Sequence, residues 1–218
     1  MNLLKTRFFR HYKNKPYKFL GIVRHSETLE ELALYETLYE NDHGKLWVRP
    51  KGMFFEDVVI ADIKQPRFRP IEFKYKIFDQ TSNSLMQEIK MIYLACFEKA
   101  FDQKKFLAKI ADKKNFMCLL AYEDEKSVAM KLGYAISDTK FYSWLGAVRP
   151  EYQDLGLASE LMRQQHEWCK QQKFERIEAR SRNQFTNMIS LNLANGFKIT
   201  GTIPDQGDLK IVFEKDLT

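Results

Sequence analysis

Hydrophobic and polar residues follow two different patterns along the chain, and the change comes near residue 71. Before it, short segments rich in apolar and β-branched residues are separated by turn residues, such as the run 41–44 with its Asn, Asp and Gly. This pattern predicts strands joined by tight turns. After it, longer segments repeat apolar residues every three or four positions, which predicts helices that alternate with strands.

The first pattern predicts a small β-rich, barrel-like domain over residues 1–71. We expect its strands at residues 17–25, 32–39, 45–49 and 53–60. Pro66 and Pro70 then exclude a helix and predict an extended connector over residues 64–71. The second domain is expected to span residues 72–218.

The second pattern predicts an α+β domain. Strands are expected at 72–79, 116–122, 128–137, 141–148, 177–181 and from 197 onward, ending with 209–214. Helices are expected at 82–100, 102–111, 155–172 and 185–195. The helix over 155–172 is clearly amphipathic, with Leu157, Leu161 and Trp168 on one stripe.

Composition narrows the class of protein. Hydrophobic residues make up 44% and charged residues 29%, which is typical of a folded globular chain. The longest apolar run, 116–122, is far shorter than the roughly 20 residues that a membrane span needs. We therefore expect no membrane partner. The three cysteines have neither the spacing of a metal site nor that of a disulfide framework, so we expect no metal site and a cytoplasmic location. The net charge of +6 favours a solvated basic surface over a nucleic-acid site.

The segment over residues 148–158 carries the clearest chemistry. An apolar strand ends at Val148, Pro150 breaks the chain, and a long helix opens at a Gln-x-x-Gly-x-Ala sequence. The N-terminus of a helix has unpaired backbone N–H groups and a partial positive charge, so it binds phosphates. We therefore expect a pyrophosphate to lie on the N–H groups of Gln153, Asp154, Leu155, Gly156, Leu157 and Ala158.

With the Asn195-Gly196-Phe197 sequence that closes the next helix, this loop resembles the signatures of the GNAT superfamily of N-acetyltransferases. The resemblance covers residues 72–217. It implies a mixed central sheet, flanked by helices, that splays open between strands 141–148 and 177–181. It also implies acetyl-CoA as the cofactor, with Ala147 and Val148 along the pantetheine arm and Asn183 or Asn187 as a further contact.

Two positions depart from the family pattern. Many members carry a Tyr that protonates the leaving thiolate where this chain has Asn192, and an amide can donate a hydrogen bond but no proton. Many members also carry a Glu on the strand before the loop, where this chain has Tyr142 and no carboxylate between residues 140 and 149. Asn192 and Tyr142 are therefore the candidate catalytic residues, and Tyr134, Glu178 and Glu123 are further candidates for the base.

The N-terminal segment resembles a small bacterial domain family of unknown function over about residues 5–70. The resemblance rests on the sequences around His11, Arg24 to Glu30, Trp47 and Met53. It implies no activity.

The leading hypothesis is an enzyme that transfers an acetyl group from acetyl-CoA to an amine by direct attack. The acceptor is a small-molecule or peptide amine, and an α-amino group is favoured over a lysine side chain because no base is visible. The alternative is a non-catalytic acyl-CoA sensor whose N-terminal module binds a protein or a nucleic acid. The oligomeric state does not follow from the sequence.

Overall fold

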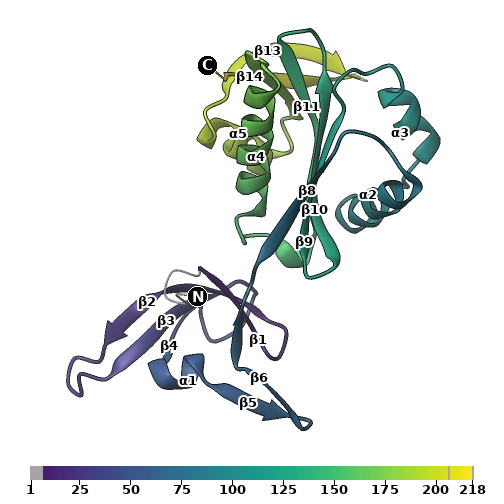
Figure 1. The fold of residues 1–218 in the computed structure, drawn as a ribbon. Coiled ribbons are helices and arrows are strands. Elements are labelled where there is room, and N and C mark those ends of the chain that lie inside the picture. Colours follow the sequence, from purple (N-terminus) through teal and green to yellow (C-terminus); the bar gives the residue numbers. More distant parts are fainter. Residues whose placement is uncertain (1–6, 206, 218) are drawn as a thin grey trace. The chain divides into compact units, whose positions relative to one another are not determined.

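A computed structural model describes residues 7–205 and 207–217 of the chain (Figure 1). The chain divides into two compact units, Met1–Glu72 and Phe73–Thr218. Each unit has a hydrophobic core of its own.

The first unit is β-rich, as the sequence predicts. Five antiparallel strands form one sheet in the order β4 (Leu46–Pro50), β3 (Glu31–Thr37), β2 (Pro16–Arg24), β1 (Phe8–His11) and β7 (Phe68–Pro70). A separate hairpin joins β5 (Asp57–Ile60) to β6 (Ile63–Pro66). The segment expected as a connector is extended, and it supplies the two strands β6 and β7.

The prediction of a strand over residues 53–60 is wrong for the first half of that segment. The short helix α1 (Lys51–Phe55) stands there, and β5 begins only at Asp57. Phe54 and Phe55 both pack against the Phe9 ring, at centroid distances of 5.3 and 6.1 Å. Consecutive residues of a strand point to opposite faces, so a strand could not bring both rings to one core.

The second unit is a seven-stranded mixed sheet covered by helices on both faces (Figure 1). Its strand order is β13 (Lys198–Asp205), β14 (Asp208–Asp216), β12 (Arg176–Arg182), β11 (Lys140–Val148), β10 (Lys126–Ala135), β9 (Met117–Glu123) and β8 (Phe73–Phe78). The helices are α2 (Asn83–Cys96), α3 (Gln103–Ile110), α4 (Leu157–Gln171) and α5 (Thr186–Ala194), with the one-turn 3₁₀ helix η2 (Pro150–Tyr152) before α4. The predicted α+β fold class is confirmed.

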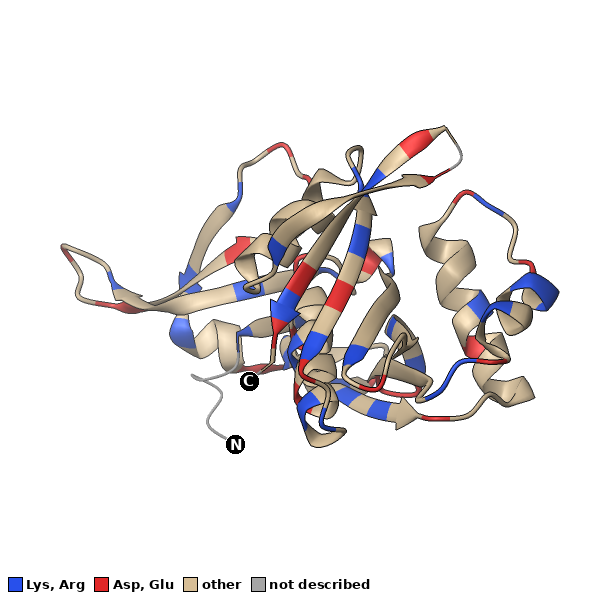
Figure 2. Ribbon diagram, turned by 90° about the horizontal axis from the view of Figure 1, so that it is seen from above, with Lys and Arg blue, Asp and Glu red and all other residues tan. Residues whose placement is uncertain are grey.

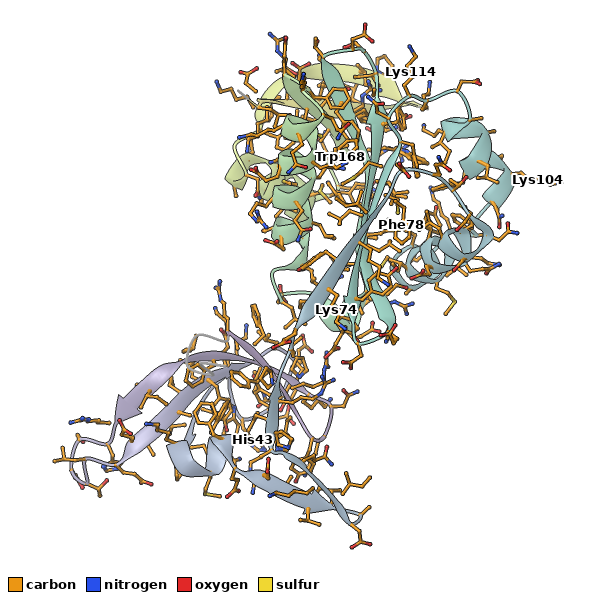
Figure 3. All side chains as sticks on the ribbon, in the orientation of Figure 1. His43, Lys74, Phe78, Lys104, Lys114 and Trp168 are labelled. Atoms are coloured by element: carbon orange, nitrogen blue, oxygen red, sulfur yellow. The ribbon has the colours of Figure 1, made fainter. Side chains whose placement is uncertain are left out.

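Helices α2 and α3 cover one face of this sheet, and α4 and α5 cover the other (Figure 1). Leu85 and Ile89 of α2 are almost fully buried, in one cluster with Met130 and Leu132 of β10. Trp168 lies on α4, on the other face (Figure 3). Its ring meets the Phe141 ring of β11 edge-on, at a centroid distance of 5.3 Å. Alternate residues of β10 and β11 therefore pack on opposite faces of the sheet, one covered by α2 and α3 and the other by α4 and α5.

The sheet opens between β11 and β12, which are its only parallel neighbours among the described strands. Their pairing begins at Lys140 with Arg176 and ends at Ser143 with Ala179. Strand β11 continues to Val148 without a partner on that side, whereas its other side stays paired to β10 as far as Ala129. The backbone of β11 beyond Ser143 is thus left with an unpaired edge.

Charged residues of both signs are interspersed over the second unit (Figure 2). Lys140 pairs with Glu214 at 2.7 Å, and Lys210 pairs with Asp205 at 2.9 Å. This mixture suits a solvated surface.

A β-bulge at Leu132 and Gly133 makes the fold sensitive to one methyl group. A Cβ at Gly133 would overlap the buried Phe141 ring and lie 2.5 Å from the Tyr142 carbonyl oxygen. We expect Gly133→Ala to lower the free energy of unfolding by about 1–3 kcal/mol through overpacking.

Denaturant unfolding of the whole chain measures this change. Gly201→Ala is the matched control, because a Cβ there has no heavy atom within 4 Å. Equal effects at the two glycines would contradict the proposed packing at the bulge.

Candidate active site

A cavity of about 570 Å³ occupies the opening beside β11. One wall is the end of β11, another is the loop and first turns of α4, and a third is α5. Its lining residues are Met130, Lys131, Gly146, Ala147, Val148, Tyr152, Gln153, Asp154, Gly156, Leu157, Ala158, Ser159, Leu161, Asn187, Met188 and Leu191.

The N-terminus of α4 forms one end of this cavity. Gly156 caps the helix with a φ of 76°, a left-handed conformation that suits glycine, and no side chain caps the helix by a hydrogen bond. The N–H groups of the first turn are therefore open to a ligand. The N–H of Gln153 is not among the free donors, because it is hydrogen-bonded to the Pro150 carbonyl at 3.2 Å.

Most of the predicted cofactor residues line the cavity. These are Ala147, Val148, Gln153, Asp154, Gly156, Leu157, Ala158 and Asn187. Leu155 is not among the lining residues and is 3% exposed in the core, so the contact expected through its backbone N–H stays a prediction. Of the two asparagines that the sequence could not separate, the structure places Asn187 on the cavity wall and Asn183 in the turn after β12.

Tyr142 lies away from the cavity, in the core cluster formed with α2 and α3. Its ring contacts Tyr134 edge-on at 5.5 Å, and the Arg180 guanidinium lies 4.7 Å above it. Burial raises the pKa of the Tyr142 hydroxyl to about 12. The hydroxyl therefore stays protonated at neutral pH, so it does not provide a base there.

Asn192 is 1% exposed on α5, and neither atom of its side-chain amide has a hydrogen-bond partner among the described residues. The same holds for Ser143 Oγ at the point where β11 leaves β12, and for Gln165 Oε1 and His166 Nε2 on α4. Buried polar atoms are normally hydrogen-bonded, and leaving one unpaired costs about 1–3 kcal/mol. None of these four residues is among the lining residues of the cavity, so the unpaired atoms lie in the interior of the elements around it.

Lys131 also lines the cavity, although no sequence motif pointed to it. Its residue is 7% exposed at the centre of β10, and no acceptor or carboxylate pairs with its Nζ in the described part of the chain. Burial lowers the pKa of its ammonium from 10.5 to about 8. The sequence does carry a sign of it, since Lys131 is the one charged residue in the otherwise apolar run 128–135.

Carboxylates are scarce on the cavity wall. Among the described lining residues only Asp154 carries one, and it lies at the α4 end. Glu178 is buried and paired with Arg180 at 2.7 Å and Lys140 at 3.8 Å. Of the other base candidates, Glu123 and Tyr134 are buried on β9 and β10 and do not line the cavity.

Two family models match the chain. Residues 7–70 match a protein of unknown function (DUF1653), and residues 86–197 match the acetyltransferase (GNAT) family. Both resemblances carried by the sequence are thereby confirmed. No curated protein matches the chain.

Solved structures of acetyltransferases share the fold of the second unit. The ribosomal-protein-S18-alanine N-acetyltransferase from Escherichia coli is 14% identical with a TM-score of 0.57, over 66% of this chain and 95% of that one. Arabidopsis thaliana Naa50 in complex with the bisubstrate analogue CoA-Ac-MVNAL is 21% identical with a TM-score of 0.52, over 65% and 97%. A GNAT family acetyltransferase from Elizabethkingia anophelis with acetyl-CoA bound is 15% identical with a TM-score of 0.52, over 65% and 97%.

Within the described residues, no helix has both the length and the apolar character to cross a bilayer.

The unpaired Lys131 predicts a stability that depends on pH. Between pH 8 and pH 10.5 the unfolded chain binds more protons at this residue than the folded chain, so the free energy of unfolding rises with pH there. We expect Lys131→Met to remove this rise and to stabilise the ligand-free protein at pH 7 by about 2–3 kcal/mol. Urea unfolding of both proteins at pH 7 and pH 10 measures it, and a less stable variant at pH 7 would contradict the burial argument.

Proposed function

The chain belongs to the acetyltransferase (GNAT) family, and from this premise we propose that it acetylates an amine by direct attack on acetyl-CoA in a ternary complex. Acetyl transfer is the activity of the family, and acetyl-CoA is the acyl donor. The observation that supports the proposal most strongly is one cavity that extends from the N-terminus of α4, where no side chain caps the helix, to the unpaired edge of β11. Phosphates suit the first feature, and an extended chain with amide groups suits the second.

The residues of this cavity fit the cofactor. The free N–H groups after Gln153 would hold its pyrophosphate, and Gly156 lets the phosphate approach the backbone closely. The Arg149 N–H pairs with Val128 of β10, so by alternation Val148 turns its backbone groups to the edge of β11 that β12 does not pair, where they would bind an amide of the pantetheine arm. Ala147 lines the cavity beside it and would contact the arm. Asn187 would make a polar contact from the α5 wall.

The acetyl group would then lie toward Ser143, where the two strands part. An N–H group of the β11 edge would stabilise the negative charge that develops on the thioester oxygen. Asn192 is buried on α5 and is not among the lining residues, and its amide has no proton to give, so the step that releases the thiolate needs another group.

The same scarcity of carboxylates supports an acceptor whose amine is easily deprotonated. Deprotonating a lysine ammonium at pH 7 costs about 4–5 kcal/mol, whereas an α-amino group costs about 1 kcal/mol. Glu178 is held by two cations and Tyr142 stays protonated, so water would take the proton. An α-amine, whether of a peptide or of a small molecule, is therefore the proposed acceptor class.

Gly156→Asp tests the phosphate end of the cavity. We expect a loss of acetyl-CoA affinity of at least about 100-fold, because a carboxylate would face the pyrophosphate. Gly156→Asn is the matched control, since Asn has the same size and also tolerates the left-handed conformation. Isothermal titration calorimetry measures the acetyl-CoA affinity of both variants. Equal affinities would show that the pyrophosphate does not bind at Gly156.

A pair of peptides tests the acceptor class. One has a free N-terminus and no lysine, and the other has a blocked N-terminus and one lysine. We expect released CoA thiol only with the first peptide at pH 7, at a rate that rises between pH 7 and pH 8 as more of its α-amine becomes neutral.

Faster turnover of the lysine peptide at pH 7 would contradict the α-amine proposal and would indicate a base that the cavity lacks. If the protein binds acetyl-CoA but releases no CoA thiol with any amine of a broad panel, the proposed acetyl transfer is refuted. The non-catalytic acyl-CoA sensor is then the better description.

A further inference from the structure

We propose that Lys131 is a catalytic residue whose ammonium donates a hydrogen bond, and then a proton, to the sulfur of CoA as the thioester bond breaks. The inference rests on the proposed function and assigns a group to the step for which Asn192 lacks a proton.

The position of Lys131 follows from the strand order. Strand β10 pairs with the side of β11 away from β12, and Lys131 lies directly opposite Gly146. Gly146 has no side chain, and the Lys131 stem fills the space above it. The Lys131 Cδ lies 3.3 Å, and its Nζ 3.6 Å, from the place a Gly146 Cβ would take. The stem thus crosses β11 toward the opening, where Lys131 lines the cavity beside Ala147.

The charges around Lys131 are mostly positive, which favours the binding of an anion. From α4, His166 faces the same layer, and its pKa is lowered to about 3 by burial and by the charges of Lys215, Lys131 and Lys170. From β14, the Lys215 Nζ lies 3.3 Å from His166 Nδ1 and donates to the Asn195 carbonyl. Asp154 is the one carboxylate among the described lining residues. A buried ammonium without a partner is costly, and a thiolate formed in this cavity would pair with it.

The proton and electron balance of the step is complete. The acceptor nitrogen forms a bond to the acetyl carbon, the carbon–sulfur bond breaks, and its electron pair stays on sulfur. A proton passes from Lys131 Nζ to that sulfur, which gives CoA thiol and a neutral lysine, while the acceptor nitrogen loses its proton to water. Lys131 then regains a proton from water. Since burial places the pKa of Lys131 at about 8, close to the roughly 8.5 of an alkyl thiol, the transfer is nearly balanced in energy.

The pKa of the CoA thiol bound to the whole protein tests this role without knowledge of the acceptor. Thiolate absorbance is titrated with pH for CoA bound to the wild type, to Lys131→Met and to the control Lys215→Met, which removes a nearby lysine outside the cavity. We expect the bound thiol to titrate at least one pH unit below free CoA in the wild type and in the control. In Lys131→Met we expect the shift to vanish and the affinity for CoA at pH 8.5 to fall about tenfold.

Desulfo-CoA, which lacks the sulfur, separates a sulfur contact from a general loss of binding. Its affinity should be the same within about twofold in all three proteins, and thermal unfolding checks that each variant is folded. Equal losses for CoA and desulfo-CoA, or an unshifted thiol pKa in the wild type, would overturn the role of Lys131. Acetylation of Lys131 by acetyl-CoA, seen by mass spectrometry, would also overturn it, because the lysine would then be a nucleophile. A wild type that binds neither CoA nor acetyl-CoA would refute the proposed function itself.

Discussion

The pairing between β11 and β12 ends at Ser143 and Ala179, and the whole site depends on that ending. Beyond it, β11 runs on to Val148 with one edge unpaired, and the loop after it turns into α4 through a left-handed Gly156. A sheet that stayed paired would have neither a cavity nor a free row of backbone groups. The edge of β11 and the N-terminus of α4 meet in one cavity because a single short loop joins them.

The second unit maintains this opening at a cost in stability. Packing around the bulge is tight, since Gly133 cannot gain a Cβ without meeting the Phe141 ring. Among the described residues, buried polar atoms of Ser143, Gln165 and Asn192 have no hydrogen-bond partner, and Lys131 lines the cavity with no described carboxylate paired to it. Each would be replaced by an apolar group if stability alone were selected. Of these residues, Lys131 lines the cavity and is the one that a polar ligand there would meet.

Much of this could be predicted from the sequence, because regular patterns report local structure. The Gln-x-x-Gly-x-Ala loop marked the helix start correctly, and Ser82 and Asp102 cap α2 and α3 by hydrogen bonds to Leu85 and Lys105. Other features depend on contacts between distant segments. The sequence around Phe54 and Phe55 predicts a strand, and only their common contact with the Phe9 ring shows that both rings lie on one side. Period and spacing could not decide between Asn183 and Asn187, and the one sign of Lys131 was its place as the single charged residue in the apolar run 128–135.

The central claim is that CoA lies along the β11 edge with its pyrophosphate at the start of α4. Amide hydrogen exchange of the whole chain, with and without CoA, tests it most directly. We expect CoA to slow exchange in residues 144–148 and 154–159, and to leave the sheet of the first unit unchanged. Protection of other strands in place of these two segments, at a CoA concentration that saturates binding, would contradict the account.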